Sequence, residues 1–266
     1  MENEIRIKDL YHYREFISDK VDNFLFRGVE DIDYKLIPKI GRLFEGFVVD
    51  EETRKRIETE IFLNFTLKAT EYQDLPDKAM YTLALAQHHG LATRLLDWTT
   101  DPFVALYFAL KQTGYNSINK PSVVYAYKHS FNIKTKALIE EDGETYMSEV
   151  GEGIINTPRY PRDFFFLPPI VSPRISAQSG ILQAFPDPTK PFDDDTIVKL
   201  IIEGEGLKQK IRGSLNLYGY NEHRLFPTID NLCNFLNENN KELNNLKLNK
   251  ADCNKSIVDS VSRGEN

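Results

Sequence analysis

The fold is decided by the stretch AQHHGLATRLLDWTTDPFVALYFAL, which runs from residue 86 to residue 110. Gly90 can adopt the left-handed backbone conformation that is common after helix ends, so we predict that a helix ends just before it. RLLDWT, residues 94–99, is then predicted to be a strand. Asp101 can cap a further helix and Pro102 can start it. Because that helix is apolar on nearly every side, we expect it in the core of the protein.

Helices and strands are also predicted on both sides of this stretch. Apolar side chains at helical spacing, with their caps, predict helices at residues 7–16, 50–71, 77–88 and 230–236. Runs of β-branched and aromatic residues bounded by Pro, Gly or Asp predict strands at residues 23–28, 122–128, 163–167, 180–185 and 196–203. The second half of the chain is therefore predicted to be mainly sheet. Together these elements predict an α+β protein.

The sequence predicts one domain followed by a tail. Residues 1–236 hold the predicted elements, including the N-terminal helix. Within them, residues 134–162 are polar and are interpreted as a long surface insertion that can order over the site. Residues 237–266 are rich in Asn and Lys with few large apolar groups, so we expect a polar flexible tail. No repeat of solenoid length is visible.

Composition restricts the class of protein. With 266 residues, 41% hydrophobic and 12% aromatic, the chain can bury one substantial core. The formal charge of -7 argues against a chain-wide basic surface for nucleic acid, although local patches can oppose the net sign. Two cysteines, Cys233 and Cys253, form neither a disulfide framework nor a metal motif. This cysteine usage fits a reducing cytoplasm, and the charged N-terminus and the lack of a long apolar stretch predict a protein without a secretory signal or a membrane segment.

Charged residues in the strand at 94–99 are the first candidates for a site. Alternation places Asp97 and Thr99 on one face of the strand, and Arg94 and Trp98 on the other. A charge on each face of a strand between core helices is costly unless it is paired. Arg94 and Asp97 should therefore each find either a structural ion-pair partner or a ligand.

Arg27 is a second candidate. It follows three consecutive apolar residues and precedes Gly28, an arrangement that can present a guanidinium where backbone approaches a phosphate closely. The sequence contains no GxSxG motif, no P-loop and no GxGxxG motif. Serine-hydrolase, kinase and Rossmann interpretations are therefore disfavoured.

His88 and Gln178 complete the candidates. His88 and His89 are separated by about 100° around a helix, so they cannot both face one metal ion, and no further His or Cys completes a zinc set. One of them can serve as a hydrogen-bond donor or general base, or can simply cap the helix end. Gln178 stands at the start of a predicted strand, where its amide can contact a polar ligand or belong to a turn.

Taken in order, these segments resemble the FRG domain family, which is named for its Phe-Arg-Gly motif and found mainly in bacterial and phage proteins. The similar segments are Phe26–Gly28, YKLIPKIGR at 34–42, the stretch at 86–110, PRISAQSGILQAF at 173–185 and HRLFPTIDNLCNFL at 223–236. The similarity runs from about residue 20 to residue 236. Two positions depart from the family pattern: Ala92 replaces the usual proline, and Val29 stands where glutamine is common.

The FRG pattern in turn resembles ADP-ribosyltransferases, and this resemblance implies a fold and a substrate. The implied fold is a mixed, largely antiparallel sheet flanked by helices, and the implied substrate is NAD. Those enzymes hold NAD with an arginine on the first strand, a hydroxyl-rich strand and a third polar residue. The resemblance thus assigns NAD binding to Arg27, Gly28, Thr93, Arg94 and Thr99, and catalysis to His88, Asp97 and Gln178.

The implied roles leave two functions open. His88 would be the base, with Asp97 holding its tautomer. A glutamine at position 178 cannot act as the carboxylate that is usual at the third position. This disfavours transfer of ADP-ribose to protein. Transfer to nucleic acid, or binding of NAD without any transfer, stays open. The first hypothesis is an ADP-ribosyltransferase-like enzyme, a bacterial toxin or phage-defence effector. The alternative is a non-catalytic module that binds nucleotide or nucleic acid.

Overall fold

The computed structural model describes residues 3–18, 20–77, 79–111, 120–129, 163–168 and 172–240. The chain divides into two compact units, residues 1–220 and residues 221–266. The expected insertion at 134–162 lies outside the described residues, as does most of the expected tail. The proposed boundary at residue 236 stays a prediction.

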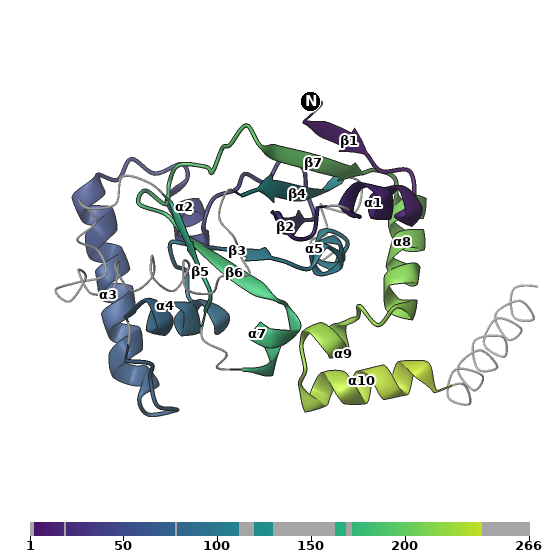
Figure 1. Cartoon of the computed structure of the whole chain (residues 1–266). Coiled ribbons are helices and arrows are strands. Elements are labelled where there is room, and N and C mark those ends of the chain that lie inside the picture. Colours follow the sequence, from purple (N-terminus) through teal and green to yellow (C-terminus); the bar gives the residue numbers. More distant parts are fainter. Residues whose placement is uncertain are drawn as a thin grey trace, which may run out of the picture. The chain divides into compact units, whose positions relative to one another are not determined.

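One sheet organises the first unit (Figure 1). Among the described residues its strands are β1 (Glu4–Arg6), β2 (Phe24–Val29), β3 (Leu95–Thr99), β4 (Ser122–Lys128), β5 (Phe164–Phe166), β6 (Gly180–Ala184) and β7 (Ile197–Ile202). Their order is β1-β7-β4-β2-β3-β6-β5. The pairing of β1 with β7 is parallel, and the other neighbours are antiparallel. The expected α+β class with a mixed, largely antiparallel sheet is confirmed.

Helices surround this sheet. In the first unit the described helices are α1 (Leu10–Ile17), α2 (Lys39–Phe44), α3 (Glu51–Ala69), α4 (Ala79–His88), α5 (Pro102–Ala109), α7 (Pro173–Ala177) and α8 (Glu205–Leu217). The second unit holds α9 (Glu222–Leu225) and α10 (Ile229–Asn239). The predicted cap of α5 is confirmed, because the Asp101 carboxylate accepts from the backbone N–H groups of Phe103 and Val104. Gly90 has the predicted left-handed conformation after α4, with φ of 95°.

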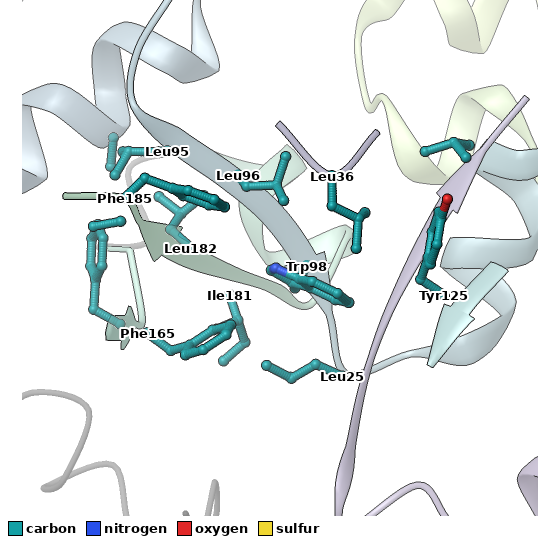
Figure 2. Close-up of a cluster of buried hydrophobic side chains, with 14 of the residues drawn as sticks. Leu25, Leu36, Leu95, Leu96, Trp98, Tyr125, Phe165, Ile181, Leu182 and Phe185 are labelled. Carbon is teal, nitrogen blue, oxygen red and sulfur yellow. The ribbon is translucent and has the colours of Figure 1, made fainter. Parts of the chain in front are cut away.

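The hydrophobic core is centred on Trp98 of β3 (Figure 2). Its indole packs against the rings of Tyr127, Phe165 and Phe192, with centroids 5.8, 6.4 and 6.0 Å away. The indole Nε1–H donates to Oε1 of the fully buried Gln183 at 2.7 Å, so the one polar group of the ring is satisfied inside the core. The neighbouring strand β6 is thereby fixed to β3 by a side chain as well as by its backbone ladder.

The opposite side of β2 is closed by α5. A Cβ added to Gly28 would lie 1.8 Å from the carbonyl oxygen of Ala105, so only glycine permits this approach of helix and strand. α5 is the apolar helix that the sequence placed in the core, and Val104, Ala105 and Leu106 are buried. Gly28 therefore sets the distance between α5 and the strand that carries Arg27.

The expectation that the second half is mainly sheet is wrong for the described residues. α7 and α8 lie between and after its strands, and α8 is amphipathic, with Ile211 and Leu215 buried. The few apolar residues of α8 are spaced by four but lie among charged residues. This helix was therefore not predicted from the sequence. β1 and α2 were also not predicted, because each is a short element whose stability comes from its neighbours rather than from local preference.

Candidate functional site

The site begins where β2 and β3 separate. These strands are paired at one position only, Phe26 with Thr99, although both continue beyond it. The guanidinium of Arg27 crosses the opening and donates from Nη1 to the carbonyl oxygen of Asp97 at 2.5 Å. A side chain thus satisfies a carbonyl that the ladder between the two strands leaves unpaired. The Arg27 side chain is 19% exposed, so the cation is largely enclosed by protein and only in part accessible.

The Asp97 carboxylate is held in place by α4. Its Oδ1 accepts from Nε2 of Gln87 at 2.8 Å, and its Oδ2 lies 3.9 Å from Arg27 Nη1. The Thr93 hydroxyl in turn donates to Oε1 of Gln87, which fixes the orientation of the amide. Two-thirds of the Asp97 side chain is exposed, so the carboxylate is positioned from one side and open on the other. Gln87 is a positioning residue that the sequence reading did not select, although the family motif has a glutamine there.

A pocket of about 260 Å³ opens beside these groups. Six of the residues selected from the sequence line it: Arg27, Gly28, His88, Asp97, Thr99 and Gln178. The apolar part of the wall includes Phe26, Ala105, Phe108 and Leu182. The pocket has polar groups on an apolar wall, which is the usual character of small-molecule sites.

Arg94 and Thr93 were also assigned to NAD binding, but they do not line this pocket. Arg94 is 2% exposed, and its guanidinium donates to both carboxylate oxygens of Glu58 at 2.9 and 3.1 Å. It also donates to the carbonyl oxygens of Phe185 and Pro186. Of the two readings left open for Arg94, the geometry corresponds to the structural ion pair. Thr93 is buried and contacts Gln87, so it acts on the pocket through that side chain.

His88 stands at the end of α4 and faces the pocket. Its Nε2 lies 3.1 Å from the hydroxyl oxygen of Ser172. The pKa of the imidazole is lowered below its ordinary value, first because the ring is partly buried and then because the Arg174 cation is near. The ring is therefore neutral at neutral pH and able to accept a proton. Among the described contacts, the Asp97 carboxylate is held by Gln87, and the expected support of the His88 tautomer by Asp97 stays a prediction.

The far side of the pocket comes from α7 and the turn after it. The Gln178 carbonyl accepts from the Thr99 hydroxyl at 2.7 Å, which joins this turn to the end of β3. Ser179 follows with a φ of 46°, a left-handed conformation that non-glycine residues seldom adopt. Arg174 also lines the pocket, so its wall holds a second guanidinium besides that of Arg27. Arg174 lies in the family-like segment at 173–185, but the sequence did not indicate it as a site residue.

Comparison with known proteins supports the family resemblance. Residues 22–117 match the family model of the FRG domain. This range includes Arg27, Gln87, His88 and Asp97, and it ends before Gln178. The chain has no significant match among curated proteins or among solved structures.

In the part of the chain that the structure describes, no helix is long and apolar enough to cross a membrane. In the same part of the chain, no group of three or more His, Cys, Asp and Glu side chains is arranged to hold a metal ion.

Proposed function

We propose that the pocket binds NAD as a substrate and that the protein is an ADP-ribosyltransferase-like enzyme. The observation that carries the proposal is the convergence of Arg27, His88, Asp97 and Gln178 on one pocket from four separate segments. The resemblance to the FRG family extends the proposal to a bacterial toxin or phage-defence effector. Its acceptor is water, a nucleic acid or a protein side chain.

The pocket contains a carboxylate even though position 178 is a glutamine. Asp97 is fixed by Gln87 on one side and is open to the pocket on the other. A carboxylate fixed before the reaction stabilises positive charge that develops in the transition state. Asp97 can therefore take the role that a glutamate has on a later strand in ADP-ribosyltransferases. The Gln178 amide would then contact the nicotinamide or ribose without adding charge.

The remaining groups supply binding and proton transfer. Arg27 and Arg174 line the pocket as cations, and each guanidinium can donate two parallel hydrogen bonds to oxygen atoms of the ligand. In the proposed reaction the bond between the nicotinamide nitrogen and the ribose carbon breaks, and its electron pair neutralises the ring nitrogen. Water or an acceptor hydroxyl then bonds to that carbon and gives its proton to the neutral His88.

One observation favours the alternative, a module that binds a nucleotide or nucleic acid without reaction. Arg27 and Asp97 both have partners in the protein itself, the Asp97 carbonyl and the Gln87 amide. These contacts would give a rigid binding pocket whether or not any bond is broken in it. The two functions share the pocket and differ in whether nicotinamide is released.

The test uses the purified full-length chain and NAD. Release of nicotinamide, followed by chromatography, is expected from the wild type and is expected to fall at least about a hundredfold in Asp97→Asn, which keeps the shape and removes the charge. Asp195→Asn, at an exposed aspartate before β7, is the matched control and should keep full activity. NAD binding measured by calorimetry without nicotinamide release would favour the binding module. If the protein does not bind NAD, both the proposed enzyme and a module that binds NAD without reaction are ruled out.

A further inference from the structure

A second hollow of about 170 Å³ lies against the first pocket. Arg27, Gln87 and Asp97 line both, so these three side chains form a common wall. The rest of the second hollow comes from three segments: α2 with Lys39 and Arg42, the turn after α4 with Gly90 and Leu91, and β3 with Leu95 and Leu96. Two spaces that share a wall of polar side chains can hold two parts of one ligand.

The second hollow carries a surplus of positive charge. Arg27, Lys39 and Arg42 line it, and Asp97 is the one carboxylate among its lining residues, which leaves two positive charges unbalanced. The whole chain carries a net charge of -7, so this local excess runs against the average. Desolvation is the first cause that lowers the pKa of both Arg27 and Arg42, and the nearby Arg42 cation lowers the pKa of Arg27 further.

The cations are anchored at places that leave donors available. Lys39 Nζ donates to the carbonyl oxygen of Gly90 at 2.8 Å, and an ammonium has two further N–H groups. Arg42 Nη1 donates to the carbonyl of Ile37, and a guanidinium has five N–H groups in all. These bonds to backbone carbonyls hold the charged head groups of both side chains in place without neutralising their charge. An anion entering the hollow would meet positioned donors.

We propose that this hollow is an anion subsite, which binds the phosphate groups of a ligand whose ring enters the neighbouring pocket. The inference rests on the proposed function and adds the side chains that would hold the pyrophosphate of NAD. Asp97 would stand at the ribose between the two spaces, and Arg27 would contact the ligand from the common wall. Lys39 and Arg42 would then set specificity for phosphate and contribute little to contacts with the ring.

The experiment measures binding by calorimetry for inorganic pyrophosphate, ADP-ribose and NAD. The test variant is Lys39→Ala with Arg42→Ala in the full chain. The matched control is Lys210→Ala with Arg212→Ala, which removes the same two charges from the exposed side of α8. We expect the test variant to bind all three probes at least about tenfold more weakly and the control to bind as the wild type does. The wild-type affinity should also fall with added salt, because exposed charges are screened.

The outcomes separate the subsite from the proposed function. If NAD binds equally to the wild type and the test variant, the subsite is wrong while NAD binding stands. If pyrophosphate binds and is lost in the test variant but NAD does not bind, the subsite stands and the NAD proposal falls. If pyrophosphate and ADP-ribose bind to neither protein, the subsite is wrong. Should the double variant unfold, Lys39→Glu at an exposed position tests the same expectation, with weaker binding supporting the subsite and unchanged binding overturning it.

Discussion

Arg27 Nη1 lies 2.5 Å from the carbonyl oxygen of Asp97, so a side chain of one strand satisfies the backbone of the next where their ladder has stopped. The same guanidinium lines both the pocket and the anion subsite. Arg27 is therefore a structural partner of β3 and, in our proposal, a ligand-binding residue as well. A change at Arg27 should affect both, and the two effects can be separated by the choice of substitution.

Arg27→Ala is expected to reduce the free energy of unfolding by about 1–3 kcal/mol, because the Asp97 carbonyl loses its charged donor. NAD binding should be lost as well. Arg27→Lys restores the charge but not the planar group with two parallel donors, so it should recover part of the stability and little of the binding. Urea denaturation and calorimetry measure the two effects. Equal NAD affinity in Arg27→Lys and wild type would contradict a bidentate role for the guanidinium.

His88 predicts a pH dependence of nicotinamide release. A base is active when it is neutral, so the rate should rise with pH through the pKa of His88 and then level off. Because that pKa is lowered below 6.5, the rise should be complete near neutral pH. Arg174→Gln removes a cation that lowers this pKa, so the midpoint of the rise should move to higher pH. Arg56→Gln, an exposed arginine on α3, is the control and should leave the midpoint unchanged. An unchanged midpoint in Arg174→Gln would show that His88 does not limit the rate.

Much of the fold could be predicted because its signals are local. In residues 86–110, the helix-end signal at Gly90, the strand pattern of RLLDWT and the helix start at Asp101 and Pro102 predicted the end of α4, the strand β3 and the capped helix α5. The apolar run before Gly28 gave β2. The 13-residue helix α8 was missed because its apolar stripe is sparse, and its burial depends on neighbours distant in the sequence. Strand order also depends on such distant contacts, which explains why no order was predicted.

The site could be predicted in part, for a similar reason. Charge inside a predicted strand indicated Asp97, and the glycine after an apolar run indicated Arg27. The sequence could not decide that Arg94 pairs with Glu58, since the two residues are 36 positions apart and meet only in the folded chain. It also gave no local reason to select Gln87, whose role depends on contacting Asp97 and Thr93 together.

Gly28 is expected to be a structural requirement of the site. Gly28→Ala places a methyl group 1.8 Å from the Ala105 carbonyl oxygen, and neither backbone segment can move without opening the packing of α5 on β2. We expect a loss of about 3 kcal/mol or more in the free energy of unfolding. Gly213→Ala is the control, because this helical position in α8 has no atom within 4 Å of an added Cβ. That change should stabilise the protein by about 0.5–1 kcal/mol, since alanine favours helix. Similar effects at the two positions would contradict the close approach of helix and strand.

Asp163 predicts a second pH dependence, in stability rather than activity. Its carboxylate accepts from Nε2 of Gln183 at 2.9 Å, the residue that also accepts from Trp98. Burial raises the pKa of the carboxyl from 3.8 to about 6. The folded protein therefore holds this proton more tightly than the unfolded chain does. The stability contributed by the protonated form is present at low pH and is lost as pH rises from about 4 to about 6.

Asp163→Asn keeps the acceptor for Gln183 and removes the buried charge. We expect Asp163→Asn to raise the free energy of unfolding at pH 8 by about 1–2 kcal/mol. This is less than the full pKa shift of Asp163 would give, because solvent reaches part of its carboxyl group. At pH 4 the wild-type carboxyl is protonated in the folded protein, so the difference between the variant and the wild type should largely disappear. Urea denaturation at both pH values measures this difference, and Asp195→Asn serves as the exposed control with no such change. A stabilisation that is equal at pH 4 and pH 8 would show that the amide improves packing and that the charge of Asp163 is not the cause.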